Sequence, residues 1–254
     1  LYFGDVVNKY TNLQTGERAL EYLKERILEC QVSYPLIFNK KLEVAVDVGA
    51  NLGGFIIHAH RHFNKIYAFE PVSENCSVIN QLLEAYNIKN VELYHNAVYG
   101  ESNKELPLYC QHLDGETNSG DVSCATFDHE KKGYQNVGEM CETISLSDLM
   151  SSLNIDQIDY LKMDCEGSEY EIFENFDDYD RISVIALELH AFYSDSRRRS
   201  LVQKLMNHYF FVDLHIEDTL VTTVGDLVSN SSQDLEELMD KSSLLLISKK
   251  ALNL

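Results

Sequence analysis

Two apolar segments of the chain end in side chains that can accept a proton. The segment "IDYLKMD" (158–164) ends at Asp164, and the segment "SVIALELH" (183–190) ends with Glu188 and His190. Because one residue separates Glu188 from His190, both side chains project from the same side of a strand. An imidazole titrates at about pH 6.5, and a positioned base contributes roughly 10²–10⁴-fold to a rate. We therefore predict that all three are catalytic, with His190 as the base and the two carboxylates orienting it or the substrate.

The same three side chains allow a second interpretation. Two carboxylates and an imidazole can hold a divalent cation that lowers the pKa of an acceptor hydroxyl group. Ligands from separate strands are weak grounds for a metal, so none is assigned. Glu166, two residues after Asp164, also has two interpretations. It either holds the loop through backbone N–H groups or is an acid of the kind favoured at a helix N-terminus.

A glycine-containing turn follows the valine-rich segment "EVAVDV" (43–48). Gly49 and Gly53 lack a Cβ atom, so the backbone can approach a ligand closely there. Glu70 follows Gly49 by 21 residues and ends the next predicted strand. A carboxylate at that offset accepts hydrogen bonds from the hydroxyl groups of a ribose. The turn and Glu70 together predict a cofactor that contains a nucleoside.

The turn differs from the pattern of dinucleotide-binding proteins. It reads G-x-N-x-G, with Asn51 where a G-x-G-x-x-G motif has its second glycine. Asp47, just before the turn, would repel a pyrophosphate but suits an ammonium group. S-Adenosyl-L-methionine carries an amino acid and a ribose and no phosphate, so it is the predicted cofactor. An NAD-dependent oxidoreductase on a similar sheet is the alternative.

These residues belong to a chain in which predicted strands alternate with predicted helices, which indicates an α/β protein with a mainly parallel sheet. Within the segment after Asp164, Ser168 and Glu171 match an S-x-x-E capping box, which predicts the start of a helix. Two further strands near the end of the chain are expected to form a terminal antiparallel pair. The predicted strands are 43–48, 65–71, 91–100, 142–145, 158–164, 183–190, 210–216 and 243–249.

The same pattern predicts the domain organisation. Residues 1–41 are expected to form an N-terminal helical extension, since 16–29 places leucine and isoleucine at helical spacing. Residues 42–254 are expected to form the α/β domain. Within it, 101–140 has no clear period and is predicted to be an irregular insertion or lid, with short strands at most.

Five segments, in this order, resemble the FkbM-type S-adenosylmethionine-dependent methyltransferases: "VDVGANLGGF", "YAFEP", "HNAV", "LKMDCEGSEYEIF" and "ALELH". The resemblance implies a Rossmann-like class I methyltransferase fold, with seven strands and helices on both faces. It also implies methylation of hydroxyl groups on sugars or natural products. By this resemblance, the methionine part would be surrounded by Asp47, Gly49, Asn51 and Gly53. Glu70 would hold the ribose, Asn96 and Ala97 would lie by the adenine, and Asp164 would face the transferable methyl group.

The composition limits the partners. The chain has 41 acidic and 21 basic residues, a formal net charge of −20. Because nucleic-acid affinity rests on Lys and Arg, this charge argues against nucleic acid and anionic membranes and favours a small-molecule or glycosidic substrate. The six cysteines form no CxxC pair, and the first residues lack a signal-peptide pattern. A cytoplasmic protein with reduced thiols is expected, and the oligomeric state is left open.

The sequence favours an O-methyltransferase over three other functions. Asn51 and the glycine spacing disfavour an NAD-dependent oxidoreductase. A non-catalytic cofactor-binding module has no use for clustered ionisable groups near a methyl donor. A nucleic-acid methyltransferase conflicts with the acidic charge of the chain.

Overall fold

The computed structural model describes most of the chain from residue 40 onward. The described residues are 27, 30, 33–36, 38, 40–113, 116–125, 133–190, 192–216, 222–228 and 243–252. The predicted helix at 16–29 lies almost wholly outside them, so the N-terminal extension stays a prediction.

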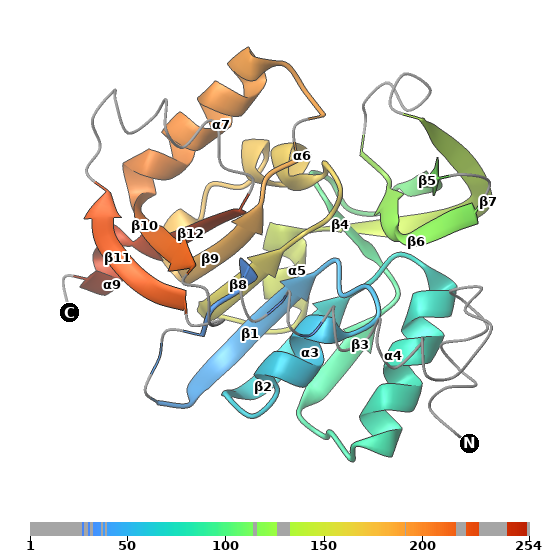
Figure 1. The fold of residues 1–254 in the computed structure, drawn as a ribbon, viewed down its shortest axis with the longest axis horizontal. Coiled ribbons are helices and arrows are strands. Elements are labelled where there is room, and N and C mark those ends of the chain that lie inside the picture. The colour runs from blue at the N-terminus through green and yellow to red at the C-terminus, as the bar shows by residue number, and fades with distance from the viewer. Residues whose placement is uncertain are drawn as a thin grey trace.

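Within the described residues, the main sheet has eight strands in the order β11-β10-β12-β9-β8-β1-β2-β3 (Figure 1). Five neighbouring strands, from β9 to β3, are parallel to one another. The remaining pairs, β9 with β12, β12 with β10 and β10 with β11, are antiparallel. The predicted mainly parallel sheet with a terminal antiparallel pair is confirmed, and β11 adds one edge strand to the seven expected. The bounds are β1 (Leu42–Val48), β2 (Phe63–Phe69), β3 (Val91–Tyr94), β8 (Ile158–Met163), β9 (Ile182–Glu188), β10 (Tyr209–Ile216), β11 (Thr222–Val228) and β12 (Ser243–Ser248).

The strand order reverses between β1 and β8. The chain adds β2 and β3 on one side of β1 and then returns to place β8 and β9 on the other side. In open α/β sheets, ligands bind beyond the carboxyl ends of the strands at such a reversal. The turn after β1 and the loop after β8 therefore flank the expected ligand site.

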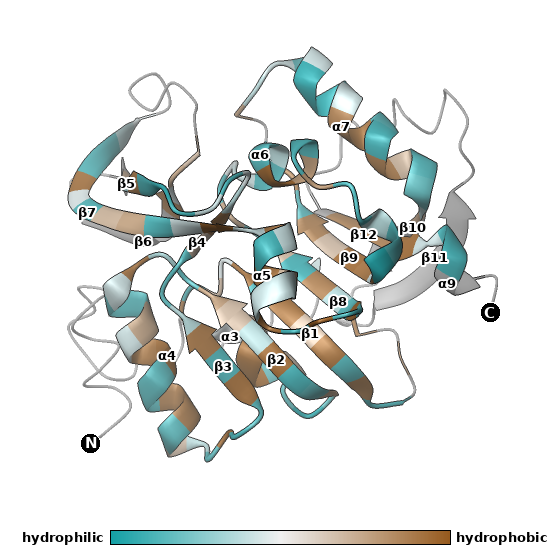
Figure 2. Cartoon of the chain, turned by 180° about the vertical axis from the view of Figure 1, so that it is seen from behind, coloured by the Kyte–Doolittle hydropathy of each residue, from teal (hydrophilic) through white to brown (hydrophobic). Residues whose placement is uncertain are grey.

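Side chains of the central strands alternate between two hydrophobic clusters on opposite faces of the sheet. Val46 and Leu161 pack in one cluster with helices α5, α6 and α7, and Ala45 and Tyr160 pack in the other with α3. Figure 2 shows the hydrophobic residues concentrated in the strands between these layers. The helices are α3 (Gly54–Ala59), α4 (Ser73–Ala85), α5 (Leu146–Ser152), α6 (Glu169–Glu174), α7 (Asp195–His208), α9 (Lys249–Leu252) and the 3₁₀ helix Tyr179–Arg181.

The predicted insertion forms most of a second sheet, of order β4-β7-β5-β6. It is more regular than expected, because β5 pairs antiparallel with both β6 and β7 and β4 pairs parallel with the end of β7. A small hydrophobic cluster packs side chains of this second sheet against Val72, which follows β2 of the main sheet. Its other members include Ala97, Leu108, Cys124 and Cys141. Its strands are β4 (Ala97–Tyr99), β5 (Glu105–Leu113), β6 (Glu116–Ser123) and β7 (Tyr134–Ser145).

Among the helices in the described part of the chain, none combines the length and the apolar composition needed to span a bilayer.

Candidate active site

A pocket of about 530 Å³, part of it open to solvent, lies beyond the ends of β1, β2 and β8. Val122 and Cys124, from the end of β6 and the residues after it, line another wall. The lining includes six of the predicted site residues: Gly49, Asn51, Glu70, Asn96, Ala97 and Asp164. Of the other predicted residues, Asp47, Gly53, Glu188 and His190 do not line it.

The turn after β1 packs directly against the loop after β8. Gly49 has a φ of +75°, and a Cβ atom at this position would lie 1.8 Å from the carbonyl oxygen of Asp164. The N–H of Asp164 donates to the carbonyl oxygen of Val48 at 3.1 Å. Gly53, with a φ of +84°, precedes the first turn of α3. Gly49, which was predicted to let the backbone approach a ligand, therefore also lets the ends of β1 and β8 approach each other.

Glu70 is 3% exposed and holds the turn through backbone hydrogen bonds. Its Oε2 atom accepts the N–H of Asn51 at 2.7 Å, and its Oε1 atom accepts the N–H of Val72 at 3.0 Å and Nδ2 of Asn75 at 3.1 Å. Burial raises the pKa of Glu70 to about 7, although these three donors favour the carboxylate. Each carboxylate oxygen has two acceptor positions, so Oε2 can accept a further hydroxyl group from a ligand.

Asp47 does not face the pocket. It is fully buried, and its Oδ1 atom lies 3.1 Å from Nζ of Lys162, an ionic contact without the geometry of a hydrogen bond. Lys162 also donates to the carbonyl oxygens of Gly49 and Val48, and its ammonium group lies 5.3 Å from the ring centroid of Tyr34. Burial raises the pKa of Asp47, and the charge of Lys162 opposes that rise. Asp47 therefore pairs with Lys162, whose ammonium group holds the turn, and not with the ammonium group of a ligand as predicted.

Tyr34 connects two of the predicted catalytic carboxylates. Its hydroxyl group lies 2.9 Å from Oδ2 of Asp164 and 3.3 Å from Oε2 of Glu188, with donor geometry to both. Burial and then the charge of Asp164 raise the pKa of Glu188 to about 7. The structure thus brings Asp164 and Glu188 together, as expected, but through a tyrosine that no motif singled out.

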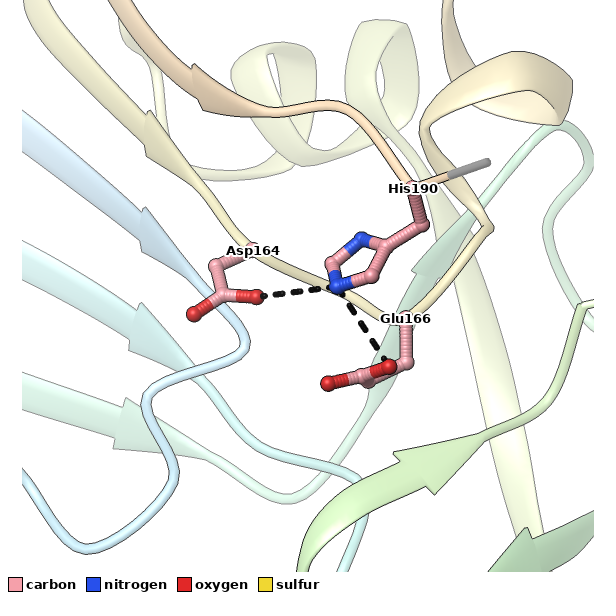
Figure 3. Close-up of side chains that lie close together, drawn as sticks. All are labelled: Asp164, Glu166 and His190. Atoms are coloured by element: carbon pink, nitrogen blue, oxygen red, sulfur yellow. Dashed lines mark ion pairs between the residues drawn. The ribbon is translucent and has the colours of Figure 1, made fainter. Parts of the chain in front are cut away.

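His190 lies among three carboxylates, and Figure 3 shows two of them, Asp164 and Glu166, beside the same ring nitrogen. Its Nδ1 atom is 3.0 Å from Oε1 of Glu169, and its Nε2 atom is 3.4 Å from Oε2 of Glu166 and 3.9 Å from Oδ1 of Asp164. Burial lowers the pKa of His190, but the charge of Glu169 and the contacts with Glu166 outweigh it and raise this pKa to about 12. An imidazole already protonated at neutral pH does not accept a proton. The expected role of His190 as a free base does not fit this arrangement.

The loop after β8 is held by Glu169 rather than by Glu166. Oε1 of Glu169 accepts the N–H of Cys165 at 3.1 Å, whereas the carboxylate of Glu166 points to His190 and accepts the hydroxyl group of Tyr134 at 3.3 Å. Glu166 has a φ of +51°, a left-handed conformation that turns its side chain toward the cluster. The interpretation of Glu166 as the loop-holding acid is therefore corrected in favour of Glu169.

The predicted capping box does not form. Ser168 precedes α6, but its side chain caps no backbone N–H group. Its hydroxyl group instead lies 3.5 Å from Sγ of Cys124. Glu171 accepts the hydroxyl group of Tyr193 at 2.7 Å and pairs with Arg197. The helix start was predicted correctly, but a tertiary contact took the place of the local one.

Three features define a class I methyltransferase fold. They are a mainly parallel sheet whose strand order reverses between β1 and β8, the antiparallel strands at its end, and a pocket at the strand ends. Residues 47–220 match the family described as the Methyltransferase FkbM domain. The chain belongs to this family.

Several known proteins, including the following two, are similar to this chain. Methyltransferase 1 of Beauveria bassiana (strain ARSEF 2860) is 28% identical over 158 residues, which cover 57% of this chain and 63% of that protein. The crystal structure of Methyltransferase FkbM from Methylobacillus flagellatus KT has a TM-score of 0.50 and 14% identity, over 89% of this chain and 50% of that one. This chain therefore spans less than two thirds of either relative, and the structural likeness supports the fold alone.

Proposed function

We propose that the protein is an S-adenosylmethionine-dependent O-methyltransferase that acts on a hydroxyl group of a sugar or small natural product. Membership of the FkbM family supports methyl transfer. The observation that carries the proposal is that Glu70 and Asp164, from the ends of two different strands, line one pocket. A ribose at Glu70 would then have its neighbouring sulfonium toward Asp164.

The pocket has groups suited to each part of this cofactor. The backbone of the turn at Gly49 and Asn51 is close enough to surround an amino-acid group. Glu70 offers a carboxylate to ribose hydroxyl groups, and Asn96 and Ala97 line the pocket beside the end of β3, where the adenine is proposed to lie. Asp47 is left out of this assignment because its carboxylate pairs with Lys162.

The carboxylates supply the acid–base chemistry. When bound, S-adenosylmethionine supplies an electrophilic methyl group on a sulfonium. Asp164 lines the pocket, so it accepts the hydrogen bond of the acceptor hydroxyl group and orients its oxygen. Asp164 receives the proton, and Tyr34, whose hydroxyl group contacts both carboxylates, relays a proton from Asp164 to Glu188. His190 contacts Asp164, Glu166 and Glu169 and so holds these acids in place.

The acceptor is proposed to be small and not a nucleic acid. The net charge of −20 disfavours phosphate backbones and anionic membranes. The six cysteines form no CxxC pair, which favours reduced thiols and a reducing compartment such as the cytoplasm.

Calorimetry tests the cofactor assignment. S-Adenosylmethionine and S-adenosylhomocysteine should bind with one site per chain, and NAD should not bind. Glu70→Gln should weaken both interactions by tenfold or more, whereas Glu92→Gln, on the exposed part of β3, should leave them unchanged. Binding of NAD alone would overturn the proposal.

The type of methylation is tested with deuterated S-adenosylmethionine and a set of sugars and polyols. A labelled product with an alkali-stable methyl group supports an ether formed on a hydroxyl group. An alkali-labile ester or an N-methyl product would contradict O-methylation of a hydroxyl.

A further inference from the structure

Three side chains at the carboxyl end of β8 and just beyond β9 bring metal-ligating atoms together. Asp164, Glu166 and His190 each offer one ligand atom within 4.8 Å of the other two. Nε2 of His190 lies 3.9 Å from Oδ1 of Asp164 and 3.4 Å from Oε2 of Glu166. Figure 3 shows the two carboxylates pointing toward the same ring nitrogen. Two donors about 2.2 Å from one ion lie at most about 4.4 Å apart. The contacts of Nε2, at 3.4 and 3.9 Å, fall within that limit.

Each of the three side chains is oriented by a different residue outside the set. Tyr34 contacts Oδ2 of Asp164 and leaves Oδ1 directed at His190. Tyr134 donates to Glu166 at 3.3 Å, and Oε1 of Glu169 lies 3.0 Å from Nδ1 of His190. Metal-binding histidines commonly donate their second ring N–H to a carboxylate in this way, which fixes Nε2 as the ligand atom.

Glu169 gives an independent indication of a cation. It is 0% exposed, and its Oε2 atom has no hydrogen-bond partner among the described residues. A buried carboxylate is costly unless positive charge lies nearby. Among the described residues, the one side chain capable of positive charge in contact with Glu169 is His190. A cation bound at Nε2 would place further positive charge on the far side of the same ring.

We infer that Asp164, Glu166 and His190 bind one divalent cation of the Mn²⁺ type. Carboxylate oxygens favour Mg²⁺, Ca²⁺ or Mn²⁺, whereas imidazole favours transition metals, so a set of one nitrogen and two oxygens selects a transition ion that accepts both. The ion takes the position of the Nε2 proton. This set differs from the alternative interpretation of the sequence, in which Glu188 takes the place of Glu166.

The use of this ion rests on the proposed function. Asp164 lines the pocket, so an ion on its Oδ1 atom is within reach of an acceptor hydroxyl group. When bound, the ion would lower the pKa of that hydroxyl group, whose proton would pass to Asp164 and, through the hydroxyl group of Tyr34, to Glu188. The acceptor oxygen then forms a bond to the methyl carbon as the carbon–sulfur bond breaks. The electron pair of the broken bond remains on sulfur.

Electron paramagnetic resonance of free Mn²⁺ tests the site on the full chain without cofactor. Addition of protein should remove the free-ion signal with one Mn²⁺ per chain. His190→Ala and Glu166→Gln should each weaken binding by more than tenfold, and Glu169→Gln by about 10–100-fold, because it loses the orienting partner of His190. His62→Ala, which removes an exposed histidine, and Glu92→Gln should bind as the parent does.

Thermal unfolding and calorimetry with S-adenosylhomocysteine accompany each variant. The unfolding temperature should stay near the parental value in Glu166→Gln, which shows that lost Mn²⁺ binding does not reflect unfolding. Absence of Mn²⁺ binding to the parent, or equal binding by parent, Glu166→Gln and His190→Ala, overturns the metal site. If S-adenosylhomocysteine still binds in that case, the proposed function stands without the metal.

Discussion

The hydroxyl group of Tyr34 lies 2.9 Å from Oδ2 of Asp164, although 130 residues separate the two in the sequence. The same hydroxyl group lies 3.3 Å from Glu188. A residue that precedes the first strand therefore positions carboxylates that follow two later strands. Because Tyr34 is only 3% exposed, this contact is shielded from water.

Replacing Tyr34 with Phe should separate positioning from cofactor binding. The variant loses both hydrogen bonds but keeps the ring, so kcat should fall by about tenfold or more while the affinity for S-adenosylhomocysteine changes by less than twofold. Steady-state kinetics and calorimetry measure the two effects. Tyr209→Phe is the matched control, since it also loses a buried hydrogen bond, to Tyr179, away from the pocket. An unchanged kcat in Tyr34→Phe would remove Tyr34 from the site.

Gly49 should be far less tolerant of a side chain than another glycine of similar conformation. Gly49→Ala places a Cβ atom 1.8 Å from a backbone oxygen, whereas Gly138, with a φ of +78°, has open space around its Cβ position. Gly138→Ala should cost about 1–2 kcal/mol in free energy of unfolding, from the left-handed conformation alone. Gly49→Ala should cost at least about 2 kcal/mol more. Equal losses in denaturant unfolding would show that the close approach to Asp164 is not required.

The affinity for S-adenosylhomocysteine should increase as the pH rises from 6 to 8. Burial raises the pKa of Glu70 to about 7, so a rising pH converts it from the acid to the carboxylate that accepts ribose hydroxyl groups. About a tenth of the groups are ionised one unit below the pKa, which limits the loss of affinity at pH 6 to roughly tenfold. Calorimetry across this range should show the trend in the parent and none in Glu70→Gln. A trend that persists in the variant belongs to another group.

The contribution of Glu70 to the stability of the fold should fall as the pH rises, whereas the affinity for S-adenosylhomocysteine should increase. Folding raises the pKa of Glu70 from 4.5 to about 7, so the folded chain holds this proton more tightly than the unfolded chain does. The contribution of Glu70 is fully present below pH 4.5 and is lost as the pH rises to 7. The free energy of unfolding, compared between the parent and Glu70→Gln across that window, should reveal this loss.

Breaking the Asp47–Lys162 pair should destabilise the protein more than removing both charges. Lys162→Met leaves the fully buried Asp47 without its ionic partner, and such a change typically costs about 3–5 kcal/mol. The double variant Asp47→Leu, Lys162→Met should recover much of that loss. Denaturant unfolding of the two single variants and the double variant measures the coupling. Additive effects would mean that the pair does not support the turn.

The sequence predicted the parts of the site that follow from sheet geometry. Carboxyl ends of parallel strands share one edge, so residues that end different strands were expected to meet there. Gly49, Glu70 and Asp164, which do so, line one pocket in the structure. The mainly parallel order of the strands could be predicted for the same reason, because it follows from the alternation of strands with helices.

Contacts between distant segments could not be predicted in the same way. Tyr34 follows no motif, and its partners depend on how the segment before β1 packs. Lys162 gave a partial signal, since it is a lysine within an apolar strand, but its pairing with Asp47 required the register of β1 and β8. The surroundings of His190 could not be predicted either, because Glu166 and Glu169 face its ring only after folding.

A crystal structure with S-adenosylhomocysteine tests the central assignment most directly. The ribose hydroxyl groups should lie within hydrogen-bond distance of Glu70, with the sulfur atom on the side of the pocket formed by Asp164. A ligand bound elsewhere, or one in this pocket with its ribose turned away from Glu70, would contradict it.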